Sequence, residues 1–259
     1  MTISWIILTF NRAEIVDYSV HYNLAHSGRV PDEIVWVDNG STDKVREVMT
    51  AFGPDKTVLL DQNYGVAVGY NRGYLAATCD YVVITGCDTE MPDNWLTTFE
   101  KYLTKIPDTG VACIYCSDIS QVPERKRGEP VIVNGLPIQP ALPFGRRIVN
   151  RKLLLDEIGL LHEDLGLYGW EDNVWGERAL TVCARLQLWC YSIPGQIALH
   201  LGTEGMEPTT TAKHGDLKDD PAYHAFKRQE ALDPAKQAKL AKIREDFYPY
   251  YNPYKTNVP

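Results

Sequence analysis

The stretch Ile3-Ser4-Trp5-Ile6-Ile7-Leu8-Thr9-Phe10-Asn11-Arg12 places polar residues directly after an apolar run. Two later stretches share this design: Glu33–Val37 leads into Asp38-Asn39-Gly40-Ser41-Thr42-Asp43, and Tyr81–Thr85 leads into Gly86-Cys87-Asp88-Thr89-Glu90. Apolar runs that end in turn residues are typical of buried strands. Ligands of an open α/β sheet bind outside the carboxyl ends of its strands. We therefore expect these strand ends to meet at one site, suited to a nucleotide diphosphate held through a metal.

Strand and helix patterns alternate along the first half of the chain. Strand-like runs lie near 3–9, 33–38, 57–61, 81–87 and 111–117, with helical stretches near 12–26, 42–52, 66–77 and 93–105. This alternation predicts an α/β fold whose mostly parallel central sheet is flanked by helices. Further on, the patterns predict helices near 151–159, 171–184 and 235–247, a strand from Leu186 to Ile193, and loops at 118–150 and 202–221.

Composition narrows the class of protein. The net charge of −8 argues against broad nucleic-acid binding, which depends on Lys and Arg. No apolar stretch approaches the roughly 18 residues of a membrane span, and we interpret the N-terminal run as a strand and not a signal peptide. The six cysteines suit buried thiols in a reducing compartment, so we expect a soluble cytoplasmic protein. Cys113 and Cys116 lack a second such pair, and a strand would point them to opposite faces.

Asp88 and Glu90 are two carboxylates separated by one residue just past a strand-like run. Both could reach a hard divalent cation through oxygen. A nucleotide diphosphate is anionic, so Mg²⁺ or Mn²⁺ would offset its repulsion by an acidic protein. A solvated turn with a helix cap is the alternative interpretation. His200, at the end of the last strand-like run, is compatible with either a ligand or a core histidine.

The turns after the second and third strands offer further polar groups. Asp38 could accept hydrogen bonds from a base or a ribose, although a simple turn and helix cap explains it equally well. Gly65 would let the backbone approach a ligand. Asn71 and Arg72, in the helix that follows, could face the nucleotide. Close packing alone would explain the glycines spaced four apart in this helix, but not the asparagines.

A second acidic pair, Glu171-Asp172, follows Trp170 at the start of a predicted helix. The helix dipole favours the charged form of a carboxylate at this position. An ionised carboxylate could take a proton from an acceptor hydroxyl, and Trp170 could stack on a sugar or a base. Acidic pairs also decorate helix starts without any catalytic role.

In chain order, these segments resemble the family 2 glycosyltransferases, inverting nucleotide-sugar enzymes of the GT-A fold. The resemblance covers about residues 1–202. It implies a GT-A domain at 1–202, with a nucleotide-binding half at 1–117 and an acceptor and catalytic half at 118–202. Residues 203–259 would form a loop, a helix and a Tyr-rich tail packed on the same domain.

The resemblance also implies a metal-dependent, inverting transfer from a nucleotide-diphosphate sugar, with a UDP-sugar as the expected donor. The acceptor would be a hydroxyl of a glycan, a protein or a modified nucleic acid. Asp172 would act as the general base with Glu171 beside it, and Mn²⁺ or Mg²⁺ would be bound by Asp88, Glu90 and His200, where Glu90 replaces the usual second Asp. The implied nucleotide-sugar site consists of Thr9, Asn11, Arg12, Asp38, Asn39, Asn63, Gly65, Asn71, Arg72, Asp88 and Trp170.

Two other functions stay open at this point. A sugar-phosphate nucleotidyltransferase also uses paired acids on an α/β sheet, but its first strand typically leads into a Gly-rich basic loop. A catalytically silent nucleotide-sugar-binding module is the other alternative. The basic clusters Arg125-Lys126-Arg127 and Arg146-Arg147 could meet an anionic acceptor or simply form a solvated face.

Overall fold

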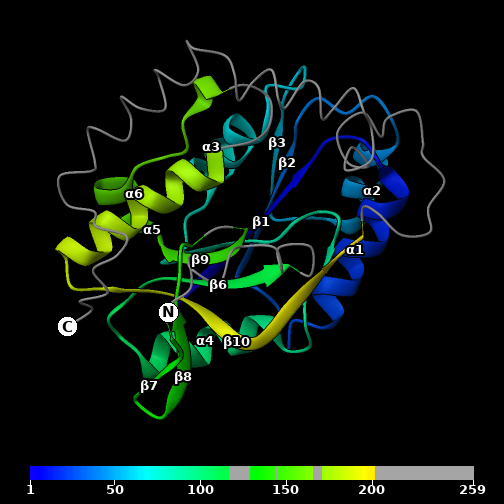
Figure 1. Cartoon of the computed structure of the whole chain (residues 1–259). Coiled ribbons are helices and arrows are strands. Elements are labelled where there is room, and N and C mark those ends of the chain that lie inside the picture. The colour runs from blue at the N-terminus through cyan, green and yellow to red at the C-terminus, as the bar shows by residue number, and fades with distance from the viewer. Residues whose placement is uncertain (117–128, 144, 166–170, 202–259) are drawn as a thin grey trace, which may run out of the picture.

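A ten-stranded mixed sheet with the path β3-β2-β1-β4-β9-β6-β10-β8-β7 forms the centre of the computed structural model (Figure 1). The structure describes residues 1–116, 129–143, 145–165 and 171–201. Its strands are β1 (Ile3–Thr9), β2 (Glu33–Asp38), β3 (Lys56–Leu59), β4 (Tyr81–Ile84), β5 (Thr89–Glu90), β6 (Thr109–Cys116), β7 (Val131–Val133), β8 (Leu136–Pro140), β9 (Arg146–Asn150) and β10 (Trp189–His200). Its helices are α1 (Ala13–Ala25), α2 (Val45–Phe52), α3 (Val66–Ala76), α4 (Trp95–Lys105), α5 (Arg151–Leu153), the π-helical turn η3 (Leu154–Ile158), the 3₁₀ turn η4 (Glu163–Leu165) and α6 (Glu171–Arg185).

The first four strands of the path are parallel, as the alternating pattern predicts. β1 pairs with β2 and β4, and β2 pairs with β3. Thr9 lies opposite Asp38 in this register, so both strands end at the same edge of the sheet. Every residue of β2 is buried, because a parallel sheet is covered on both faces. The expected convergence of the strand ends is therefore present.

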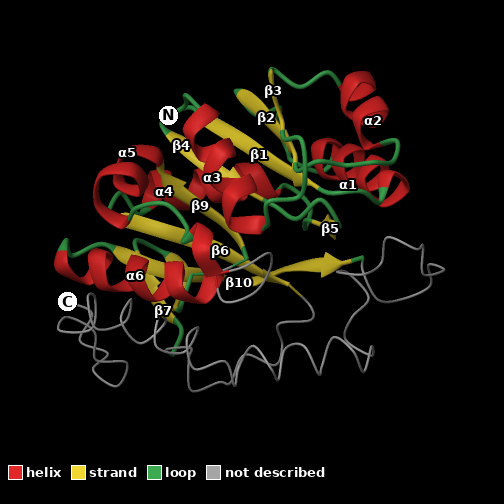
Figure 2. Ribbon diagram, turned by 90° about the horizontal axis from the view of Figure 1, so that it is seen from above, coloured by secondary structure: helices red, strands yellow, loops and turns green. Residues whose placement is uncertain are grey.

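Helices cover both faces of the sheet (Figure 2). Side chains of α1, α2 and α4 pack with Trp5 and Trp36 on one face, and side chains of α3, η3 and α6 pack with Ile6 and Val35 on the other. Gly73 is essential to the close approach of α3, because a Cβ atom there would lie 2.4 Å from Ile6 Cγ2. The spaced glycines of α3 thus serve packing.

The prediction of a loop throughout 118–150 is wrong for part of this segment. β7 and β8 form an antiparallel hairpin, and β9 inserts between β4 and β6, antiparallel to both. Asn134 and Gly135 form the hairpin turn with φ values of 48° and 79°. An Asn-Gly pair between apolar runs is a strong hairpin signal, and it was available in the sequence. The pairing of β9 is long-range and leaves no local pattern.

Other predicted elements are confirmed with shifted bounds. Helical structure covers 151–158 as α5 and η3, and the last strand runs from Trp189 to His200. Cys113 and Cys116 lie on β6 in different hydrophobic clusters, on opposite faces of the strand as expected. The loop predicted at 202–221, the helix predicted at 235–247 and the Tyr-rich tail lie outside the described residues. Among the helices that the structure describes, none is long and apolar enough to cross a membrane.

Candidate active site

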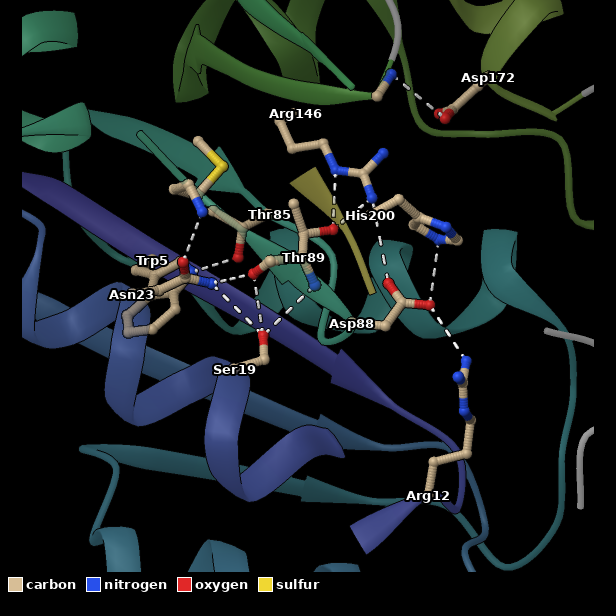
Figure 3. Close-up of polar contacts among 12 residues, drawn as sticks. Trp5, Arg12, Ser19, Asn23, Thr85, Asp88, Thr89, Arg146, Asp172 and His200 are labelled. Carbon is tan, nitrogen blue, oxygen red and sulfur yellow. Dashed lines mark hydrogen bonds and ion pairs between the residues drawn. The ribbon is translucent and has the colours of Figure 1, made fainter. Parts of the chain in front are cut away.

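Asp88 is the centre of a charged cluster at the carboxyl edge of the sheet (Figure 3). Its Oδ2 atom lies 3.3 Å from Arg12 Nη1 and 3.3 Å from His200 Nε2, and its Oδ1 atom lies 4.0 Å from Arg146 Nη2. These partners come from the start of α1, the end of β10 and the start of β9. The fold therefore brings three basic side chains from distant segments to one carboxylate.

The turn that carries Asp88 is anchored to α1. The carbonyl oxygen of Thr89 accepts hydrogen bonds from Ser19 Oγ at 3.0 Å and from Asn23 Nδ2 at 2.7 Å (Figure 3). His200 lies opposite Thr89 in the antiparallel β5–β10 pair, and Leu201 N donates to the Asp88 carbonyl at 2.8 Å. His200 thus reaches Asp88 through backbone pairing, which fixes its distance.

Burial alone would raise the pKa of the Asp88 carboxyl group. The hydrogen bond and charge of His200, together with the charges of Arg146 and Arg12, outweigh burial and hold this pKa well below its ordinary value. Asp88 is therefore a carboxylate at neutral pH. An ionised oxygen at a sheet edge is a competent ligand for a hard cation.

Asp88 and His200 fit two neighbouring positions of one divalent ion. Ligands at about 2.1 Å from a metal lie about 3 Å apart when they are adjacent, and the Asp88 and His200 atoms are 3.3 Å apart. Glu90 does not join them. Its side chain accepts a hydrogen bond from Tyr18 on α1 at 2.6 Å, and no described group of three or more acids, histidines or cysteines could hold a metal. The geometry thus supports two protein ligands and not the expected three.

Asp172 is the second residue of α6 and lies on the other side of the same region. Its Oδ1 atom accepts a hydrogen bond from Arg147 Nη1 at 2.6 Å, and its Oδ2 atom accepts from Gly145 N at 3.4 Å. The Asp172 side chain is 34% exposed, whereas that of Arg147 is fully buried. Burial would lower the pKa of Arg147, but Asp172 and Tyr74 raise it above its ordinary value. This pair is therefore ionised.

Arg146 and Arg147 connect the two carboxylates. Successive side chains of a strand point to opposite faces, and these two begin β9. Arg146 donates to Thr89 Oγ1 from Nε at 3.1 Å and approaches Asp88, while Arg147 binds Asp172. The sequence analysis considered this pair only for an anionic acceptor, because β9 itself was not predicted. The alternation of β9 would have been the signal.

Several predicted nucleotide-binding residues hold the strand ends together. Thr9 Oγ1 accepts from Trp36 Nε1 at 3.0 Å, and Asn11 Oδ1 accepts from Thr42 N at 2.8 Å. Asp38 is fully buried and accepts from Arg46 Nε at 2.6 Å and from Ser41 N at 3.2 Å. These contacts account for a structural role of Thr9, Asn11 and Asp38, and their role in nucleotide binding stays a prediction.

The turn before α3 is closed by amide side chains. Asn39 Nδ2 donates to Asn63 Oδ1 at 2.9 Å and to the Gly65 carbonyl at 3.0 Å, and Asn63 Oδ1 also accepts from Gly65 N at 2.9 Å. Gly65 has a φ of 95°, a conformation that favours glycine. The polar groups predicted here are close together but bind one another.

Asn71 and Arg72 point to a different segment from the one expected. Asn71 exchanges two hydrogen bonds of 2.9 Å with the backbone of Leu161, and Arg72 forms a 3.3 Å ion pair with Glu163. Both contacts hold the segment that precedes α6. Glu171 is buried at the first position of α6, and Trp170 lies outside the described residues. Nucleotide binding by Asn71, Arg72 and Trp170 stays a prediction.

Comparisons with curated proteins agree with this architecture. The family model described as glycosyl transferase family 2 matches residues 4–158. The undecaprenyl-phosphate 4-deoxy-4-formamido-L-arabinose transferase of Pectobacterium atrosepticum is 29% identical over 110 residues, which is 40% of this chain and 34% of the relative. The corresponding protein of Pectobacterium carotovorum is 30% identical over 107 residues, 39% of this chain and 33% of the relative. The matched part thus spans about a third of these relatives.

Solved structures share the fold at low sequence identity. S. aureus TarS 1-349 in complex with UDP-GlcNAc has a TM-score of 0.60 and 16% identity, covering 96% of this chain and 72% of that one. The mannosyltransferase PcManGT of Pyrobaculum calidifontis, solved with GDP-Man and Mn²⁺, has a TM-score of 0.59 and 20% identity, covering 93% and 64%. The chain therefore belongs to glycosyl transferase family 2 and has the GT-A fold.

Proposed function

We propose that this chain is a metal-dependent inverting glycosyltransferase, which moves a sugar from a nucleotide-diphosphate donor to an acceptor hydroxyl. The observation that carries the proposal is the joining of Asp88 and Asp172 at one sheet edge by the adjacent Arg146 and Arg147. Family membership and neighbours solved with UDP-GlcNAc or GDP-Man support a nucleotide-sugar donor. Two neighbours were solved with Mn²⁺, which supports a divalent metal.

The Asp88 cluster suits the anionic part of the donor. Arg12 and Arg146 carry permanent positive charges within 4.0 Å of Asp88, and guanidinium groups bind phosphate oxygens with two parallel hydrogen bonds. When bound by Asp88 and His200, Mn²⁺ or Mg²⁺ would stabilise the negative charge of the departing diphosphate. In this proposal, the two arginines orient the diphosphate so that its bond to the sugar points toward the Asp172 side.

Asp172 suits the role of general base. It lies in the first turn of α6, where the helix dipole favours the carboxylate, and it is accessible to an acceptor. As the acceptor oxygen attacks the anomeric carbon, its proton passes to Asp172. The diphosphate leaves from the opposite face of the sugar in this single displacement, so the anomeric configuration inverts.

The remaining expectations are also proposals. Residues 1–117 would supply the nucleotide site, 118–202 would supply the acceptor and catalytic groups, and 203–259 would pack on the same domain. A UDP-sugar is the proposed donor because the TarS neighbours were solved with UDP or UDP-GlcNAc. The proposed acceptor is a hydroxyl of a glycan, a protein or a modified nucleic acid, in the cytoplasm.

A donor panel tests the proposed function. The chain is incubated with UDP-glucose, UDP-GlcNAc, UDP-GalNAc and GDP-mannose in chelator, in Mn²⁺ and in Mg²⁺, and release of the nucleoside diphosphate is measured. We expect slow hydrolysis of one donor, lost in chelator and restored by metal. Metal-independent hydrolysis would remove the metal from the mechanism. Donor binding without turnover would favour a silent binding module, and formation of a nucleotide sugar from a nucleoside triphosphate and a sugar 1-phosphate would favour a nucleotidyltransferase.

A further inference from the structure

A fully buried guanidinium group lies behind the proposed base. Arg147 donates to Asp172 Oδ1 at 2.6 Å, to Tyr74 Oη at 3.2 Å and to the Gly145 carbonyl at 3.4 Å. Its guanidinium carbon lies 4.3 Å from the centroid of the Trp175 ring. These contacts come from β9, α3 and α6 and fix both the plane and the direction of the guanidinium group.

Stability alone is a weak explanation for this arrangement. Burial of an arginine is costly, and hydrophobic residues of similar volume often replace buried ion pairs without loss. Asp172 is one-third exposed and could be solvated without a partner. What the buried arginine does supply is direction, because an exposed carboxylate at a helix start otherwise rotates among several rotamers.

We propose that Arg147 is a positioning residue that holds Asp172 through Oδ1 and leaves Oδ2 as the oxygen that accepts the proton. The nearest donor to Oδ2 that the structure gives is Gly145 N at 3.4 Å, a weak contact that an acceptor hydroxyl can replace. In the reaction, the acceptor O–H bond breaks and its proton goes to Oδ2. The oxygen electron pair forms the bond to the anomeric carbon, and the bond to the diphosphate breaks. This inference rests on the proposed function.

The test uses Arg147→Met and Arg147→Lys in the full chain, each alone and combined with Asp172→Asn. The readouts are kcat and KM for hydrolysis of the donor found in the panel, and the Kd of its nucleoside diphosphate. Arg147→Met should lower kcat by about 10- to 100-fold, because small misplacement of a reacting group has effects of this size. KM and Kd should stay within about twofold. Arg147→Lys should recover part of the lost kcat, since it restores the charge without the fork.

The double variant separates positioning from a general structural role. If Arg147 acts through Asp172, then adding Arg147→Met to Asp172→Asn should cause no further loss of kcat. Tyr74→Phe removes only the hydroxyl that binds Arg147, so it should lower kcat by about two- to fivefold in a folded protein. Arg185→Met is the matched control, because it removes an exposed ion pair with Glu157 from the same helix and should leave kcat unchanged.

Each outcome gives a decision. Asp172→Asn with normal kcat would overturn the proposed base and this inference with it. Low kcat in Asp172→Asn with normal kcat in Arg147→Lys and Tyr74→Phe would overturn the inference alone. Equal further losses of kcat in the wild-type and Asp172→Asn backgrounds would assign Arg147 to general stability. If Arg147→Met does not fold, Arg147→Lys and Tyr74→Phe decide by the same criteria.

Discussion

The two edges of the central sheet each hold a carboxylate with basic partners, but the surroundings of the two carboxylates differ. At the amino edge, Glu33 binds Lys56 Nζ at 2.7 Å, Ser4 Oγ at 2.5 Å and Thr78 N at 2.8 Å. Its side chain is 9% exposed. One cation balances one anion, and neutral donors satisfy the remaining lone pairs. This carboxylate is complete without a ligand.

At the carboxyl edge, the partners of Asp88 are all basic. Two arginines and a histidine face one carboxylate that is 23% exposed. Even with a neutral histidine, this cluster has a net positive charge within a protein whose net charge is −8. An excess of positive charge at the edge where ligands bind is the property of an anion site. The comparison teaches that a carboxylate's partners, more than its burial, separate a structural role from a binding role.

The largest expected effect concerns the base at the carboxyl edge. Asp172→Asn keeps the shape of the side chain and removes its basicity, so turnover should fall about 10²- to 10⁴-fold. The Kd of the nucleoside diphosphate should change little, since Asp88 and its partners are intact. Glu171→Gln is the matched control, because Glu171 is the neighbouring acid. A product with retained anomeric configuration, or a near-normal rate in Asp172→Asn, would contradict the mechanism.

The next effect concerns the metal. Asp88→Ala should lower turnover about 10²- to 10³-fold, because a metal contributes several kcal/mol of charge stabilisation. The variant should fold, and its affinity for the nucleoside diphosphate should no longer respond to Mn²⁺ or chelator. Calorimetric titration with and without Mn²⁺ measures this response. Glu90→Ala should have a much smaller effect, since Glu90 binds Tyr18, and an equal effect would restore Glu90 as a ligand.

The third prediction tests the amino edge. Hydrogen bonds from Lys56, Ser4 and Thr78 outweigh burial and lower the pKa of Glu33 to about 2, from an ordinary value of about 4.3. Glu33→Gln should therefore lower the free energy of unfolding by about 2–3 kcal/mol at neutral pH. Because the pKa is lower in the folded state, this stabilisation is present above pH 4.3 and disappears as the pH falls toward about 2. Denaturant unfolding at several pH values checks this, and turnover should not change.

The smallest effect concerns Asp38, which combines features of both edges. It lies at the carboxyl edge but has one cation and one backbone donor as partners. Asp38→Ala should weaken UDP binding about three- to tenfold and lower the free energy of unfolding by about 1 kcal/mol, since Arg46 is 45% exposed and can return to water. Arg46→Met removes the same ion pair and keeps the carboxylate. Equal losses of affinity in both variants would favour a turn-stabilising role for Asp38.

Local sequence patterns predicted the parallel half of the sheet because the information there is local. A buried strand is a continuous apolar run, and its turn residues follow directly, so the position of Asp38 or Asp88 at a strand end is visible in one short window. The same reasoning placed Asp172 at the start of a helix. The candidate residues that the sequence predicted best are those whose position follows from the bounds of one element.

The sequence by itself thus determined the α/β class, the edge of the sheet that carries the site and the main acids, Asp88 and Asp172. Only the tertiary structure decided which groups surround these acids. It turned Glu90 toward Tyr18, used Asn71 to hold Leu161 and brought Arg146 and Arg147 between the two acids. The physical reason is that β9 owes its place to antiparallel pairing with β4 and β6, strands far away in the chain, and such pairing has no local signature.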